Sequence, residues 1–219
     1  MLEYYISDTD SKLQKIDELK KGCWVNMVAP SEAEIKLISD RLDIPEDFIK
    51  DPLDDEERSR LEREDNHILI IVDFPYITYD DVGNPFYETL PIGLIVTDEC
   101  FITISLIENP IITDFVTKKM KGFFTYKKTR FALQILFNIS SYYLRYLKII
   151  NKQTEEIEDN LRKTTNNKAL FKLIEAQKSL VYFTTALKDN RVVLEKILKS
   201  VNAQNLQGLL KFDEDDIDM

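Results

Sequence analysis

Residues 123–207 carry the sequence FFTYKKTRFALQILFNISSYYLRYLKIINKQTEEIEDNLRKTTNNKALFKLIEAQKSLVYFTTALKDNRVVLEKILKSVNAQNLQ, which contains neither glycine nor proline. All seven prolines and four of the five glycines precede this stretch, and the fifth glycine, Gly208, follows it directly. Glycine and proline are the residues that most strongly break long helices. The stretch therefore predicts one or two extended helices, to which the rest of the chain is attached.

The apolar pattern predicts two antiparallel helices, over residues 129–163 and 167–206, separated by the poor helix formers and good N-caps of the sequence TTNN. Each helix would be on the order of 50 Å long. Alternating steps of four and three residues in the second helix predict a packing stripe, formed by Leu173, Gln177, Leu180, Thr184, Leu187, Arg191, Leu194, Leu198 and Val201. The stripe predicted for the first helix is Leu133, Phe137, Leu144, Leu147, Ile150, Ile157 and Leu161. An ordinary helical hairpin that closes a soluble fold explains the same pattern.

The composition limits the classes of partner and compartment. A formal net charge of −10 disfavours a nucleic-acid partner, because that binding depends on clustered Lys and Arg. An acidic surface suits cations or basic partners, and it also serves solubility alone. Cys23 and Cys100 belong to no metal-spaced or redox motif, which predicts reduced core thiols in the cytosol. The first residues show neither the basic region nor the apolar core of a signal peptide, and the 219 residues contain no run of about 18 apolar residues.

Before residue 123 the pattern changes to that of a mixed sheet. Short apolar runs bounded by turn residues predict about six strands, among them residues 2–6, 23–28, 67–74, 90–97 and 101–106. Helices are predicted over 32–42, from Pro45 at the first helical position toward Ile49, and over 110–121. Ser31 and Glu34 form the expected capping box of the first of these helices. The predicted fold is α+β with α/β/α layers: an α/β head over residues 1–122, and a long helical hairpin with the start of a third helix over residues 123–219.

The head contains no familiar catalytic arrangement. Its glycines are isolated, so no phosphate-binding loop is present, and no serine lies in a nucleophile elbow. The single histidine, His67, cannot form a zinc site alone and is expected to be structural. Carboxylates are too numerous to nominate an acid and base pair. We therefore expect no enzymatic activity.

An acidic segment lies between the short second helix and the first long strand. Carboxylates crowded on a turn repel one another, and a hard cation such as Mg²⁺ relieves that repulsion. Arg58, Arg60 and Arg63 interrupt the segment, so a solvated, salt-bridged surface explains it as well. The acidic residues are Asp47, Asp51, Asp54, Asp55, Glu56, Glu57, Glu62, Glu64 and Asp65.

Several motifs in and around this segment resemble the cytoplasmic domain of the CorA family of magnesium channels. They are, in chain order, WVN (24–26), PEDFIKDPLD (45–54), SRLE (59–62), VDFP (72–75), YFTTALK (182–188) and LLKFDED (209–215). The inference depends on the order and spacing of these motifs, and the resemblance covers nearly the whole chain.

The resemblance implies a homopentameric funnel on the cytoplasmic face of the cell membrane. The two long helices would form its outer wall, and residues 213–218 would begin a third helix that continues into the membrane. Mg²⁺ bound between neighbouring subunits would hold the channel closed. Asp51 matches the metal ligand of the head, Lys50 stands where an acidic residue is common in the family, and Asp54 and Asp55 are added as ligands by proximity.

The family's Gly-Met-Asn pore signature is absent from the 219 residues. We therefore expect a deliberately truncated piece of a channel, whose contact with the membrane comes only through helices that follow Met219. Two alternatives stay open. The first is the same domain of a zinc-transporting relative, although the few His and Cys residues suit Mg²⁺ better. The second is a soluble helical scaffold that binds partner helices and is indifferent to cations.

Overall fold

The computed structural model describes the chain except for residues 80–82, 84, 118–119, 121, 164–166 and 203–219. The predicted start of a third helix at 213–218 therefore lies outside the described residues. The described residues form, in chain order, β1 (Leu2–Ser7), β2 (Leu13–Ile16), β3 (Trp24–Val28), α1 (Glu32–Leu42), α2 (Glu46–Lys50), the 3-10 helix η1 (Asp51–Leu53), β4 (Arg60–Glu64), β5 (His67–Tyr79), β6 (Pro85–Val96), β7 (Phe101–Ser105), α3 (Pro110–Thr117), α4 (Lys128–Lys163) and α5 (Asn167–Asn202).

Within the described residues, one seven-stranded sheet has the order β2-β1-β3-β7-β6-β5-β4. Only the central pair β3 and β7 is parallel among these strands, so the sheet is mixed. The predicted α+β fold is confirmed, with one strand more than the expected six. Among the strands absent from the prediction are the short β2 and the charged β4, whose exposed side chains give no apolar run.

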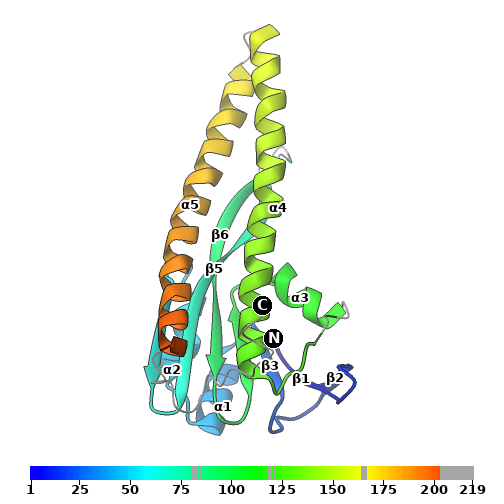
Figure 1. The fold of residues 1–219 in the computed structure, drawn as a ribbon, viewed down its shortest axis with the longest axis vertical. Coiled ribbons are helices and arrows are strands. Elements are labelled where there is room, and N and C mark those ends of the chain that lie inside the picture. The colour runs from blue at the N-terminus through cyan, green and yellow to red at the C-terminus, as the bar shows by residue number, and fades with distance from the viewer. Residues whose placement is uncertain (80–82, 84, 118–119, 121, 164–166, 203–219) are drawn as a thin grey trace.

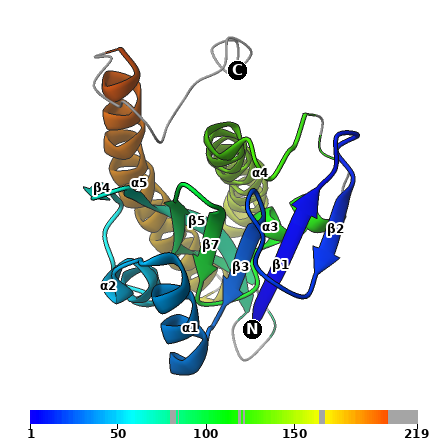
Figure 2. The same ribbon diagram turned by 90° about the horizontal axis from the view of Figure 1, so that it is seen from below.

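Helices cover both faces of the sheet (Figure 2). Because side chains alternate along a strand, Trp24 enters the core beneath α3, α4 and α5, whereas Val25 enters the core beneath α1 and α2. Trp24 is fully buried, stacks on Tyr5 at 5.0 Å between ring centroids, and meets the edge of Phe131 at 5.1 Å. The head and the long helices therefore share a core, and the division between residues 122 and 123 stays a prediction.

The strands β5 and β6 are longer than predicted, and they rise along α4 and α5 (Figure 1). The predicted strands covered only residues 67–74 and 90–97. Proline cannot donate a ladder hydrogen bond, yet both longer strands contain proline. The register places Pro91 opposite Asp73 and Pro75 opposite Thr89. These two pairs are separated by one residue, so both fall on non-hydrogen-bonded positions of an antiparallel ladder, where a missing N–H costs nothing.

The two long helices are confirmed, but the stripe predicted for α5 is wrong in part. Leu180 and Leu194 pack against the core, as predicted, and the side chain of Val201 lies outside those that the structure describes. Leu187 and Leu198 are 36% and 61% exposed. The buried stripe repeats the same spacing one residue earlier and consists of Ser179, Phe183, Ala186, Asn190, Val193 and Ile197. Small and polar side chains occupy this stripe because they let α5 lie close to the strands and bond to them. A prediction from hydrophobicity alone favours the leucines one position later in the sequence.

The stripe predicted for α4 is wrong in part. Phe137 and Leu144 are 68% and 61% exposed, whereas Ile150 is buried as expected. The side chain of Leu161 lies outside those that the structure describes. The buried face of α4 is instead rich in aromatic residues, because Phe131, Tyr143 and others pack on the ring cluster over the sheet.

The helix starts follow local signals. Ser31 Oγ accepts from the Glu34 N–H at 3.4 Å, and Glu34 Oε2 accepts from the Ser31 N–H at 2.8 Å, so the capping box is confirmed. Pro45 was predicted as the first helical residue of α2. It is instead the N-cap, and the helix begins one residue later, at Glu46. The correction is small, because proline pre-sets its own φ at either place.

Candidate functional site

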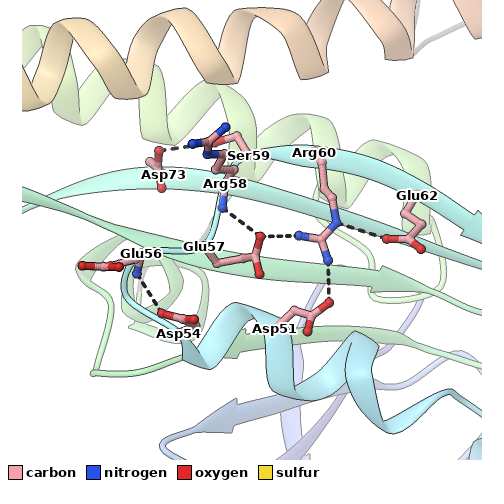
Figure 3. A network of polar contacts seen from close by, with 9 residues as sticks. All are labelled: Asp51, Asp54, Glu56, Glu57, Arg58, Ser59, Arg60, Glu62 and Asp73. Atoms are coloured by element: carbon pink, nitrogen blue, oxygen red, sulfur yellow. Dashed lines mark hydrogen bonds and ion pairs between the residues drawn. The ribbon is translucent and has the colours of Figure 1, made fainter.

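The acidic segment, residues 47–65, runs from α2 through η1 into the edge strand β4, and we call the surface that it forms the ledge (Figure 3). Asp51 begins η1, and Asp54 ends it. Short-range signals explain the turn: α2 and η1 are consecutive, and Pro52 takes an early position of η1, where its missing N–H has no helical partner to lose.

The turn is fixed to the sheet by contact between Pro52 and Gly93. A Cβ atom built on Gly93 would lie 2.3 Å from Pro52 Cγ and 2.8 Å from Pro52 Cβ. Only glycine leaves room for the proline ring against β6 at this point. Asp51 is therefore mounted on a turn that is packed directly onto a central strand, and its backbone position is well defined.

One guanidinium binds three carboxylates on the ledge. Arg60 contacts Asp51 at 2.5 Å, Glu57 at 2.5 Å and Glu62 at 3.1 Å. The side chains of Arg60 and Asp51 are 28% and 31% exposed, so water screens these pairs only in part. Three negative charges share one positive charge, and the group keeps a net negative charge.

The pKa of Asp51 reflects its partial burial first and this charge imbalance second. Burial raises the pKa of Asp51 above its ordinary value, Arg60 lowers it, and the negative charges of Glu57 and Asp47 raise it again. The net direction is upward in spite of the ion pair. The Asp51 carboxylate is thus incompletely neutralised, and a further cation beside it would stabilise its charged form.

The three predicted ligands are not gathered around one point by contacts within the chain. Asp54 Oδ1 accepts from the backbone N–H of Glu56 at 3.0 Å, whereas Asp51 is paired with Arg60. Asp55 is exposed. In the part of the chain that the structure describes, no group of three or more His, Cys, Asp or Glu side chains could hold a metal. The assignment of Asp51, Asp54 and Asp55 as ligands stays a prediction.

A second polar cluster, absent from the sequence reasoning, joins the head to both long helices. Asn190 of α5 accepts from the Asp73 N–H at 2.8 Å and from Ser59 Oγ at 3.0 Å, and its Nδ2 donates to the Asp73 carbonyl at 2.8 Å. Tyr143 of α4 donates to the same carbonyl at 3.2 Å.

Strand pairing explains why Asn190 binds there. β4 begins at Arg60, which pairs with Ile71, so no residue of β4 lies opposite Asp73. The backbone of Asp73 therefore lacks a strand partner on the β4 side. The side-chain amide of Asn190 supplies both the acceptor and the donor that a neighbouring strand would have supplied.

The carboxyl of Asp73 makes the stability dependent on pH. Burial raises its pKa from 3.8 to about 6, with a smaller contribution from Asp189, although Ser59 donates to Oδ2 at 3.3 Å. Because the folded state holds the proton more tightly, the contribution of the Asp73 carboxyl to the free energy of unfolding falls as the pH rises from about 4 to 6, by up to about 3 kcal/mol.

We expect Asp73→Asn to gain stability relative to the unmutated protein over that pH range, measured by urea unfolding at several pH values. An equal difference at pH 4 and pH 7 would contradict this, and Asp40→Asn on the exposed side of α1 is the control.

Comparisons with known proteins agree on one family. Residues 20–217 match the model of the family described as CorA-like Mg2+ transporter protein. The cobalt/magnesium transport protein CorA of Methanocaldococcus jannaschii is 26% identical over 188 residues, which cover 82% of this chain and 57% of that protein. The chain thus spans a little over half the length of this curated relative.

Solved structures with the same fold include the soluble domain of CorA from M. jannaschii, with a TM-score of 0.78, 22% identity, and coverage of 99% of this chain and 83% of that one. The cytoplasmic domain of ZntB from Vibrio parahaemolyticus has a TM-score of 0.67 at 16% identity, over 90% of this chain and 79% of that one. Among the described residues, no helix combines the length and the apolar character needed to cross a membrane.

Proposed function

Because this chain belongs to the family of CorA-like Mg²⁺ transporter proteins, we propose that it is the Mg²⁺-sensing and gating domain of a divalent cation channel and that it catalyses no reaction. The domain lies on the cytoplasmic face of the cell membrane, as one member of a homopentamer. It contacts the membrane only through helices that follow Met219. The head is residues 1–122, and the helical wall is residues 123–219.

The observation that carries the sensing role is the incompletely neutralised carboxylate of Asp51 on a rigid turn. Mg²⁺ commonly keeps several waters and binds through only one or two carboxylates. A single chain that offers Asp51, with Asp54 and Asp55 nearby for bound waters, therefore fits one half of a site that a neighbouring copy completes. Occupied sites couple neighbouring heads, and unoccupied sites leave carboxylates that repel.

The coupling of the head to the wall is supported by the Asn190 cluster. Asp73 lies on β5, Ser59 immediately precedes β4 on the same side of the ledge, and Asn190 lies on α5. A shift of the ledge is therefore transmitted to α5 through these partly buried hydrogen bonds. In the full-length protein, α5 precedes the segment that leads to the membrane helices, so cation binding at the head is transmitted along it.

Magnesium should stabilise this protein by linkage. At a free Mg²⁺ concentration ten times the dissociation constant, the gain is about 1.4 kcal/mol per site, measured as a rise in melting temperature or protease resistance. We expect Asp51→Asn to weaken the response. Arg60→Gln should strengthen it, because the three carboxylates that Arg60 binds lose their cation. The matched control is Asp40→Asn, which removes an exposed carboxylate on α1.

The outcomes separate the alternatives. If Asp51→Asn and Arg60→Gln both respond to Mg²⁺ in the same way as Asp40→Asn, Asp51 is not part of the site. If no divalent cation changes stability or assembly, a helical scaffold that binds partner helices explains the chain better. The likeness to the ZntB domain favours a zinc-transporting relative as the second candidate. A stronger response to Zn²⁺ than to Mg²⁺, unchanged by Asp51→Asn, would support that candidate.

A further inference from the structure

The only two cysteines of the chain lie side by side in the middle of the sheet. Trp24 pairs with Phe101 in the parallel ladder of β3 and β7, so the preceding residues, Cys23 and Cys100, stand next to each other. The Phe101 N–H donates to the Cys23 carbonyl at 3.1 Å. Both thiols point into the core beneath α1 and α2, and both residues are fully buried.

The two thiols differ in acidity because they interact. Interaction with the Cys100 thiol lowers the pKa of Cys23, against the opposing effect of burial. The same contact and burial raise the pKa of Cys100, whose Sγ lies 3.7 Å from Thr97 Oγ1. A buried structural cysteine is ordinarily inert because its thiol stays protonated. Cys23 differs from an isolated buried cysteine because a second thiol stands beside it.

Both cysteines are close to solvent along the chain although they are buried. Lys21 and Glu99 are exposed turn residues, one or two positions before Cys23 and Cys100. A hydrogen bond of 2.6 Å from the Gly22 N–H to the Glu99 carbonyl joins the two turns just before the cysteines.

We propose that Cys23 and Cys100 are a redox-active dithiol that peroxide oxidises to an intramolecular disulfide between β3 and β7. Neighbouring strands lie about 4.8 Å apart, and Cα atoms joined by a disulfide lie about 4.4 to 6.8 Å apart. The pair therefore meets the spacing requirement without a large movement of the backbone. The two cysteines lie at the starts of their strands, where the ladder leaves some freedom to adjust.

The reaction takes place in two balanced steps. The Cys23 thiolate attacks one oxygen of hydrogen peroxide, the O–O bond breaks, and the leaving hydroxide takes a proton to become water. This step leaves Cys23 as a sulfenic acid. Cys100 Sγ then attacks Cys23 Sγ, and the sulfenic oxygen leaves as a second water with the Cys100 proton. Two thiols have lost two electrons, and one peroxide has become two waters.

The test treats the folded, reduced protein with peroxide and then alkylates it under denaturing conditions. We expect a product lighter than the reduced protein by two hydrogen atoms, resistant to alkylation at both cysteines, and restored by a phosphine reductant. Peptide mapping without reductant should recover the peptides of Cys23 and Cys100 joined. The melting temperature should rise by several degrees on oxidation, because the bond closes a long loop.

Two variants assign the roles. In Cys100→Ser the reaction should stop at the sulfenic acid of Cys23, trapped by dimedone. In Cys23→Ser burial still raises the pKa of Cys100, so the remaining thiol should react on the order of five- to tenfold more slowly than Cys23 does in Cys100→Ser. The proposal is overturned if native wild-type protein keeps two alkylatable thiols after peroxide treatment. It is also overturned if both cysteines carry separate sulfinic or dimedone adducts without a joined peptide.

Discussion

Replacing Asn190 with alanine should lower the free energy of unfolding by about 3 kcal/mol. The amide of Asn190 makes three hydrogen bonds, to the backbone N–H and carbonyl of Asp73 and to Ser59 Oγ. Because Asn190 is only 7% exposed, water cannot replace all of these partners. The Asp73 N–H would remain without a strand partner, and an unsatisfied buried donor costs more than the hydrogen bond is worth on average.

The measurement is urea unfolding of Asn190→Ala beside Asn151→Ala. Asn151 lies on the exposed side of α4, so the same change there should stay within about 0.5 kcal/mol of the unmutated protein. Asn190→Asp provides a second test, since it places a carboxylate beside Asp73 and should cost more at pH 7 than at pH 4. A loss below about 1 kcal/mol for Asn190→Ala would show that the cluster does not hold α5 to β5.

The helices were predictable because their signals are local. The capping box at Ser31 and the absence of glycine and proline over residues 123–207 act within a few residues of where the helix forms. The face that α5 buries is different in kind, since it depends on which strand lies opposite. Ser179 and Asn190 occupy buried positions because Tyr87 and Asp73 present backbone groups there, and no pattern within α5 reports those partners.

The candidate site was predictable in place but not in pairing. Crowded carboxylates located the ledge, and a nearby arginine suggested neutralisation. Arg60 reaches Asp51, Glu57 and Glu62 only because the edge strand β4 brings it back over η1. That strand has the sequence RLERE, whose charges gave no apolar run to detect. The adjacency of Cys23 and Cys100 could not be predicted either, because it arises from the parallel pairing of two strands that are distant in the sequence.

Gly93→Ala should destabilise the protein by about 3 kcal/mol and reduce its response to Mg²⁺. The added methyl group would lie 2.3 Å from Pro52 Cγ, and the ring of a buried proline on a short helix has no rotamer that avoids it. Either β6 or η1 must move, and we expect η1 to move because it is a single short turn, whereas β6 is held in the sheet on both sides. Asp51 moves with it, so the ion pair with Arg60 and the proposed half-site are displaced together.

A double-mutant cycle distinguishes this clash from a general loss of sheet stability. Pro52→Gly removes the ring that the new methyl group meets, although it costs stability of its own through added freedom in the unfolded chain. If Pro52 is the cause, Gly93→Ala should cost at least about 1 kcal/mol less in the Pro52→Gly background than alone. Equal costs in both backgrounds would place the strain elsewhere on β6. A Gly93→Ala protein that kept the full Asp51-dependent response to Mg²⁺ would show that sensing does not require η1 to be seated on the sheet.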